Sequence, residues 1–216
     1  MIQAVIFDMD GLLVDSEPLW QRARIEACGA DRLRWTEADQ ERVMGSGTQA
    51  WAKYLAEKLD HFYSPAEIIE RVLDQMASYY HEAVPLLPGA YEVIEQLRGR
   101  YPLGIASGAP YRLIHAVLDS AGWNGVFDQV LSGDDMQNAK PAPDIYLEIM
   151  RRMGVAAENT AVFEDSGNGI LSGAAAGTKV IAVPHDYHRA SDEVLSRAAL
   201  VLPSLLAFRV EMLNDL

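Results

Sequence analysis

Two acidic residues directly follow the first apolar segment of the chain. The segment Ala4–Phe7 is a short run of strand-forming residues, and it ends at Asp8, with Asp10 and Gly11 close behind. Strand periodicity places the two carboxylates on one face, where they repel each other unless a cation or a shared proton relieves the charge. Polar residues stand at or just after the ends of later segments as well: Ser107, Lys140, Glu164 and Asp165.

The segments that would position these residues alternate between strand and helix patterns. Strand patterns cover residues 103–106, 129–131, 160–163, 179–183 and a weaker stretch near 200–202. Helical patterns separate them at about 89–100, at 110–121, and from Lys140-Pro141 to Met153. Such alternation predicts right-handed crossovers and a Rossmann-like parallel sheet.

Residues 15–87 follow a different pattern, because they contain helical segments and no strand pattern. The sequence Ser64-Pro65-Ala66-Glu67 has the cap, the early proline and the N3 glutamate of a strong helix start. We therefore expect an α/β core formed by residues 1–14 and 88–216, interrupted after its first strand by an all-helical domain.

The carboxyl ends of parallel strands meet at one edge of a sheet, so the polar residues listed above should converge there. Asp8, Asp165 and a backbone oxygen would suit an oxygen-ligated Mg²⁺. Lys140, Ser107 and backbone amides would suit phosphoryl oxygens. Taken one at a time, Ser107 and Asp165 could instead be helix caps, and Lys140 a solvated side chain.

The segment IFDMDGLLVDSE resembles the first motif of the haloacid dehalogenase superfamily in its phosphatase form, Asp-x-Asp-Gly. The segments GIASGA, KPAPDIY and VFEDSGNGI resemble the second, third and fourth motifs, in the order of that family. The resemblance covers nearly the whole chain. It implies a Mg²⁺-dependent phosphatase with a Rossmann-like core and an inserted all-helical cap domain over residues 15–87.

The resemblance also implies a role for each matching residue. Asp8 corresponds to the nucleophile that forms an aspartyl-phosphate, and Asp10 to the general acid/base. Asp8, the main-chain oxygen of Asp10, and Asp165 correspond to the metal ligands, while Glu164 would position Lys140 or the metal-bound waters. The residues expected to bind the phosphoryl group are Gly11, Ser107, Gly108 and Lys140.

The segments DGLLVDSEPLW and FEDSGNGI are most similar to hexose-phosphate phosphatases, which implies a small phosphorylated substrate such as a sugar phosphate. A β-phosphoglucomutase is the main alternative, although that subgroup has a histidine in place of Trp20 and an arginine near Thr48. A haloacid dehalogenase would lack Asp10, since an alkyl halide leaves without a proton. A non-catalytic sensor of phosphate esters would be expected to have lost Asp8 or Asp10.

Several residues of the helical domain could contact substrate or simply form its core: Trp20, Arg24, Trp51, Tyr54 and the Gly45–Thr48 turn. Arg42 is the arginine nearest to that turn, and its direction cannot be read from the sequence. His185 and His188 follow a strand pattern and could edge the site or lie on the surface.

Composition excludes several other classes of function. The net charge is −13, and no stripe of Lys and Arg suits nucleic acid. Cys28 is the only cysteine, so no disulfide can form within the chain. No apolar run is long enough to span a membrane, and the N-terminus lacks the basic region of a signal peptide. We therefore expect a cytoplasmic enzyme without a membrane partner.

Overall fold

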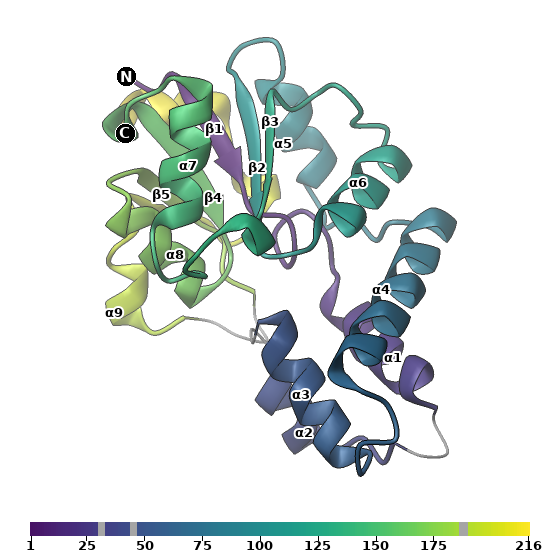
Figure 1. Cartoon of the computed structure of the whole chain (residues 1–216). Coiled ribbons are helices and arrows are strands. Elements are labelled where there is room, and N and C mark those ends of the chain that lie inside the picture. Colours follow the sequence, from purple (N-terminus) through teal and green to yellow (C-terminus); the bar gives the residue numbers. More distant parts are fainter. Residues whose placement is uncertain (30–32, 44–46, 186–189) are drawn as a thin grey trace. The chain divides into compact units, whose positions relative to one another are not determined.

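The computed structural model describes residues 1–29, 33–43, 47–185 and 190–216. It divides the chain into two compact units, which Figure 1 shows in the colours of the sequence. Residues Met1–Asp15 and Pro85–Leu216 form the α/β unit, and residues Ser16–Val84 form the helical unit. No helix within the described residues combines the length and the apolar character needed to cross a membrane.

The α/β unit contains a six-stranded parallel sheet in the order β3-β2-β1-β4-β5-β6. Its strands are β1 (Ala4–Phe7), β2 (Leu103–Ser107), β3 (Gln129–Ser132), β4 (Thr160–Glu164), β5 (Lys179–Ala182) and β6 (Leu200–Val201). Strand β1 lies inside the sheet, between β2 and β4, and its four residues are all buried. The predicted Rossmann-like parallel sheet is therefore confirmed.

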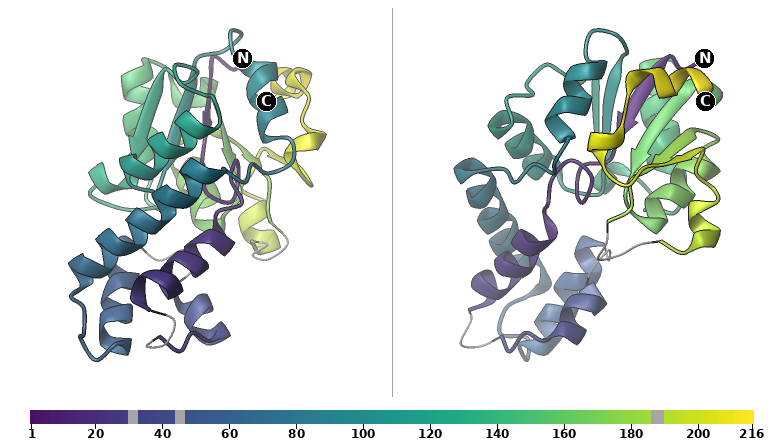
Figure 2. Two further views of the ribbon diagram at one scale, coloured as in Figure 1. Left: turned by 90° about the vertical axis from the view of Figure 1, so that its right-hand side faces the viewer. Right: turned by 180° about the vertical axis from the view of Figure 1, so that it is seen from behind.

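Helices cover both faces of this sheet. They are α5 (Ala90–Leu97), α6 (Tyr111–Ser120), α7 (Asp144–Met153), α8 (Gly167–Ala175) and the short α9 (Asp192–Leu195). Helices α7 and α8 lie in front of the sheet in Figure 1, whereas the view from behind in Figure 2 brings α5 and the C-terminal segment forward. On the α7 side, Ile6 and Val162 of the sheet share one apolar cluster with Ile149. On the other side, Phe163 stacks on Phe7 and meets the ring of Phe208 edge-on.

Helix α7 begins at Asp144, so the predicted helix start at Lys140-Pro141 is wrong. The two prolines explain the difference, because the residue before a proline is disfavoured in the α-helical region. Pro141 and Pro143 therefore delay the helix, and Pro143 becomes the residue that precedes its first turn. Lys140 consequently lies in the loop between β3 and α7, where its side chain can turn towards the strand ends.

The helical unit consists of α1 (Glu17–Cys28), α2 (Glu37–Val43), α3 (Thr48–Lys58) and α4 (Pro65–Glu82). Helix α4 packs against both α1 and α3. Its start is the predicted capping box, in which Ser64 Oγ accepts from the backbone N–H of Glu67 and the Glu67 side chain accepts from Ser64 N at 2.8 Å. Cys28, at the end of α1, is buried.

A buried carboxylate connects two helices of this unit. Asp39 of α2 accepts hydrogen bonds from Thr36 N at 2.7 Å and Thr36 Oγ1 at 2.6 Å. It also accepts from the Tyr54 hydroxyl and from Lys58 Nζ of α3, the latter at 2.8 Å. Burial by itself would raise the pKa of Asp39, but these donors stabilise the carboxylate and hold its pKa well below the usual range.

We expect Asp39→Asn to destabilise the helical unit by about 2 kcal/mol at pH 7, because the amide cannot replace a carboxylate among four donors. A depressed native pKa contributes stability above the unfolded value of about 3.9 and loses it as pH falls through the native pKa. The difference from wild type should therefore shrink below about pH 4. Urea unfolding followed by tryptophan fluorescence measures it, since Trp20, Trp35 and Trp51 all lie in this unit.

Glu41→Gln is the matched control, because Glu41 is an exposed acid on the same helix. It should leave the unfolding midpoint unchanged at both pH values. Equal effects of the two substitutions, or an Asp39→Asn effect that does not depend on pH, would contradict the structural role given to Asp39.

Candidate active site

The register of the sheet brings three strand ends together. Phe7 pairs with Ile105 of β2 and with Phe163 of β4, so the three strands stop at nearly the same level. The backbone N–H of Asp8 continues the ladder by donating to Phe163 O at 3.1 Å. Asp8 is thereby fixed at the end of β1, directly beside Glu164, the last residue of β4.

Lys140 links this strand end to its neighbours. Its Nζ donates to Asp8 Oδ1 at 2.6 Å, to Ala106 O of β2 at 3.0 Å and to Glu164 Oε1 at 2.7 Å. The side chains of Asp8 and Lys140 are 10% and 14% exposed, so water screens this ion pair only weakly. Lys140 therefore orients one oxygen of Asp8 and holds the loop of residues 133–143 against the sheet.

Glu164 is buried completely, and both of its carboxylate oxygens are occupied. While Oε1 accepts from Lys140, Oε2 accepts from Asp165 N and Ser166 Oγ, each at 3.2 Å. The first turn of α8 lies so close that a Cβ on Gly169 would fall 1.9 Å from the Glu164 carboxyl carbon. Glycine at position 169 thus allows helix and carboxylate to share this space.

Asp8, Glu164 and Asp165 offer carboxylate oxygens that lie within 4.8 Å of one another. Burial raises the pKa of Asp8 to about 7, because burial and the nearby Glu164 together outweigh the lowering effect of Lys140. Burial also raises the pKa of Asp165. Burial alone would lower the pKa of Lys140, but Asp8 and Glu164 raise it well above its usual value. A bound cation would favour the ionised forms of Asp8 and Asp165 against this burial, and oxygen ligands suit a hard divalent cation such as Mg²⁺. The cluster therefore fits the predicted metal.

The second aspartate of the motif belongs to a separate pair. The hydroxyl of Ser107, at the end of β2, donates to Asp10 Oδ2 at 3.3 Å and accepts from Ala109 N at 3.0 Å. Ser132, at the end of β3, supports the same loop, since its hydroxyl donates to Ala109 O at 2.7 Å. Asp10 is only partly buried, so its carboxyl can meet an incoming molecule.

The loop after β1 approaches Asp165 closely. Gly11 has a φ of +78°, and a Cβ on it would lie 2.3 Å from Asp165 Oδ2. Only glycine fits both the backbone conformation and the space at this position. The structure thus brings Asp8, Lys140, Glu164 and Asp165 into one cluster, Asp10 and Ser107 into a pair, and Gly11 against Asp165.

A Cβ on Gly108 would meet open space, so the backbone at this position is accessible from that side.

Tyr146 was not among the predicted site residues. Its hydroxyl donates to Glu164 Oε1 at 2.5 Å, and its ring centroid lies 4.9 Å from Lys140 Nζ. In the sequence it reads as one of the core positions of a helix, together with Ile145, Ile149 and Met150, and the structure does bury it there. Only its position six residues after Lys140 in the KPAPDIY segment could have indicated a role in the site.

The chain matches the family model for haloacid dehalogenase-like hydrolases over residues 2–177. The chain belongs to the haloacid dehalogenase-like hydrolase family. This hydrolase is 34% identical to hexitol phosphatase B of Escherichia coli (strain K12) over 187 residues, which cover 85% of this chain and 84% of that protein. It is 33% identical to a phosphorylated carbohydrates phosphatase of Thermotoga maritima over 181 residues, 83% of this chain and 84% of that one.

Among solved structures, the hydrolase resembles CbbY from Rhodobacter sphaeroides in complex with phosphate. The TM-score is 0.86 at 26% identity, and the match covers 100% of both chains. These findings confirm the superfamily that the four motifs indicated, and with it the predicted class of enzyme, a phosphatase of this family.

The candidate substrate contacts of the helical unit turn out to be mostly internal. The Arg24 guanidinium is buried and lies 5.4 Å from the Trp20 ring and 5.7 Å from that of Trp51, which is itself buried. Arg42 lies over the ring of Tyr54, at 4.5 Å from its centroid. Trp51 and Arg24 thus belong to the core of this unit, as the alternative reading had it.

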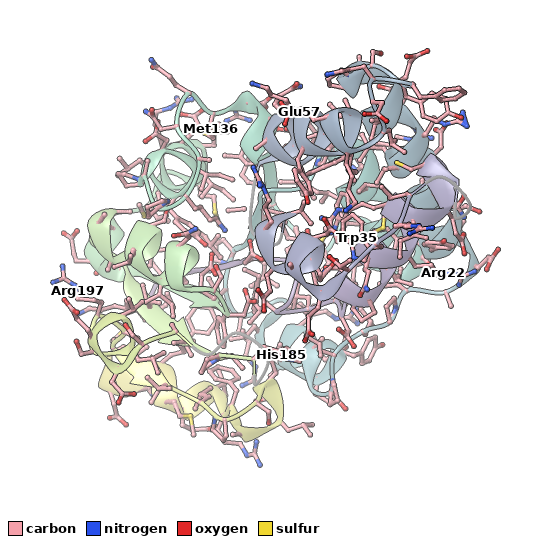
Figure 3. The ribbon with its side chains drawn as sticks, turned by 90° about the horizontal axis from the view of Figure 1, so that it is seen from below. Arg22, Trp35, Glu57, Met136, His185 and Arg197 are labelled. Carbon is pink, nitrogen blue, oxygen red and sulfur yellow. The ribbon has the colours of Figure 1, made fainter. Side chains whose placement is uncertain are left out.

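Some of the predicted positions are not among the described residues. Gly45 and Ser46 of the glycine-rich turn and the histidine at 188 lie outside them, whereas Gly47 directly precedes α3. His185 follows β5 and is partly buried; Figure 3 labels it together with Met136 and Arg197 of the α/β unit.

Proposed function

We propose that this hydrolase is a Mg²⁺-dependent phosphomonoesterase that acts on a phosphorylated sugar or sugar alcohol through an aspartyl-phosphate on Asp8. One observation carries the proposal: Asp8 is held by Lys140 at a strand end, beside further carboxylates, with Asp10 two residues away. Asp8, the main-chain oxygen of Asp10, and Asp165 would hold Mg²⁺. The ion would supply positive charge to the phosphoryl oxygens and keep Asp8 ionised.

In the first half-reaction an oxygen of Asp8 attacks phosphorus, and the bond between phosphorus and the ester oxygen breaks. Asp10 gives its proton to that departing oxygen, so the alcohol leaves neutral. Lys140 Nζ lies 2.6 Å from Asp8 Oδ1, which restricts the rotation of the nucleophile and places an ammonium beside the phosphoryl group. The hydroxyl of Ser107 is one more donor for that group.

In the second half-reaction water attacks the phosphorus of the aspartyl-phosphate. Asp10, now ionised, accepts a proton from this water, and the bond between phosphorus and Asp8 breaks. Inorganic phosphate leaves, and both aspartates return to their starting protonation states. The partial exposure of Asp10, in contrast to the burial of Asp8, suits a group that exchanges protons with ester and water in turn.

The names of the relatives support the substrate class. Hexitol phosphatase B and the phosphorylated carbohydrates phosphatase each align with more than four fifths of the chain. The net charge of −13 also favours a small ester over nucleic acid. The role of the helical unit as a substrate-selecting cap, and the cytoplasmic location, stay predictions.

Hydrolysis is favoured over phosphosugar mutase activity by the cations of the helical unit. A mutase needs a second phosphate site, for which the planar fork of an arginine is well suited. Arg42 stacks on Tyr54, Arg24 pairs with Glu17 at 3.5 Å, and Lys58 pairs with Asp39. Arg42 and Lys58 thus have partners within their own unit. Nε and Nη1 of Arg24 make no hydrogen bond within the described residues, but this guanidinium is buried near the Trp20 and Trp51 rings.

With β-glucose 1-phosphate and a trace of the 1,6-bisphosphate, we expect phosphate release to account for nearly all substrate consumed. Water then outcompetes sugar hydroxyls for the aspartyl-phosphate. Parallel assays of inorganic phosphate and glucose 6-phosphate measure the partition. Across a panel of monoesters, the best hexose or hexitol phosphate should exceed phosphoglycolate in kcat/KM by about 10-fold or more.

Two results would overturn parts of this proposal. Formation of glucose 6-phosphate well ahead of phosphate release would identify a mutase and make Arg42 the next residue to replace. If phosphoglycolate is the best substrate of the panel, the proposed phosphatase activity stands and the proposed sugar-phosphate substrate is wrong.

A further inference from the structure

The ammonium of Lys140 has no hydrogen left for a substrate. It carries three N–H groups, and three protein oxygens accept from it: Asp8 Oδ1, Ala106 O and Glu164 Oε1. To bind a phosphoryl oxygen, Lys140 must withdraw a hydrogen bond from one of these acceptors. Under the proposed function, on which this inference rests, the bond to the nucleophile Asp8 should be kept.

Glu164 Oε1 is the acceptor that can best release Lys140. It already receives a second hydrogen bond, at 2.5 Å from the hydroxyl of Tyr146, in a site where both side chains are fully buried. A buried carboxylate oxygen that loses its only donor is strongly destabilised, whereas one that keeps a close donor is not. The phenol therefore allows the lysine to turn away without leaving Oε1 unsatisfied.

Tyr146 also limits how far Lys140 can move. Its ring centroid lies 4.9 Å from Nζ, within the range of a cation–π contact, so the ammonium keeps one favourable neighbour when it shifts. The ring itself is fixed by packing, since Tyr146 shares an apolar cluster with Ile149, Val162 and Leu131. Tyr146 is thus a rigid donor aimed at Glu164 from a core helix.

We propose that Tyr146 is a positioning residue for phosphate binding: its hydroxyl holds Glu164 so that Lys140 can transfer a hydrogen bond from Glu164 to the phosphoryl group. Without that hydroxyl, Lys140 remains the only side-chain donor to Oε1 among the described residues and binds Glu164 at the expense of the substrate. The proposal predicts weaker binding of every phosphate ligand, whatever alcohol it carries. It predicts no change in the affinity for Mg²⁺, which Asp8 and Asp165 would bind.

Tyr146→Phe tests this, because it keeps the ring and removes only the hydroxyl. We expect the inhibition constant of inorganic phosphate and the KM of every monoester to rise on the order of 10-fold, with kcat changed much less. A sugar phosphate and p-nitrophenyl phosphate should be affected equally, and the Mg²⁺ concentration for half-maximal activity should stay the same. Tyr91→Phe, at a half-exposed tyrosine of α5, is the control and should change none of these values.

The Glu164→Gln background provides a second test. The amide lacks the charge that competes for Lys140, so adding Tyr146→Phe there should cause little further loss of phosphate affinity. If the role of Tyr146 were purely structural, Tyr146→Phe would lower the melting temperature by the same amount in the wild-type and Glu164→Gln proteins. It would leave the phosphate inhibition constant unchanged in both. That outcome would overturn the inference.

The two proposals fail in different ways. If wild type releases no phosphate from any ester, the proposed function fails, and binding of inorganic phosphate, measured by calorimetry, still tests Tyr146. If wild type is active and Tyr146→Phe binds phosphate as tightly as wild type, only the inference about Tyr146 fails.

Discussion

Asp8→Asn is expected to reduce phosphate release by about four to six orders of magnitude while the protein stays folded. The amide is isosteric, but it has no negative oxygen with which to attack phosphorus, and it offers a metal one charge less. In wild type Lys140 Nζ lies 2.6 Å from Asp8 Oδ1, and in the variant this contact would no longer be an ion pair. Steady-state rates with p-nitrophenyl phosphate, together with circular dichroism, measure both parts of the expectation.

Asp119→Asn is the matched control, because Asp119 is an exposed aspartate of α6. It should retain wild-type activity. Asp8→Asn protein that keeps more than a tenth of the wild-type rate would rule out Asp8 as the nucleophile, and the covalent mechanism with it.

Removal of divalent metal is the second change with a large expected effect. EDTA should abolish activity and Mg²⁺ should restore it, since a bound cation would keep the Asp8 nucleophile ionised although burial raises its pKa to about 7, and would attract the phosphate dianion. Ca²⁺ should inhibit, because its larger and more flexible coordination would let Asp8 bind through both oxygens and misalign the attacking one. Full activity in metal-free buffer would exclude this mechanism.

Asp165→Asn should raise the Mg²⁺ concentration for half-maximal activity by about 10- to 100-fold, as loss of a ligand weakens the site. Thermal unfolding provides a reading that does not depend on turnover, because a ligand that binds only the native state raises the melting temperature. Mg²⁺ should therefore stabilise wild type and Asp144→Asn, and stabilise Asp165→Asn much less. Asp144 is a suitable control, since it begins α7 and accepts from Asn138 Nδ2 outside the cluster.

The positions of Asp8, Lys140 and Asp165 could be predicted because parallel strands end at one edge of a sheet. The strand patterns located those ends to within a residue or two, and Asp8 and Asp165 lie directly at them. Lys140 lies in the longer loop of residues 133–143, so the sequence indicated that it follows a strand but not which oxygens it contacts. The pairing of Ser107 with Asp10 required the register of β1 against β2, which pattern alone does not provide.

Tyr146 could not be predicted for a physical reason. A buried tyrosine on an amphipathic helix has the same sequence signal whether its hydroxyl meets a carboxylate or a backbone carbonyl. Its partner depends on how α7 packs over the sheet, which brings the Tyr146 hydroxyl to Glu164 Oε1, and the helical periodicity does not provide that information.

The points at which the chain leaves and re-enters the α/β unit are bonded to each other. Asp15 N donates to Pro85 O at 2.9 Å, Leu87 N donates to Leu13 O at 2.9 Å, and Val14 bridges Leu86 in antiparallel fashion. The segment between these residues is an insertion whose two ends are held together by hydrogen bonds of the α/β unit, so its length can change without altering the sheet. Evolution can therefore exchange or resize the segment from 16 to 84 as a module. Protein engineers can graft at the same two bonds and leave β1 and Asp8 in place.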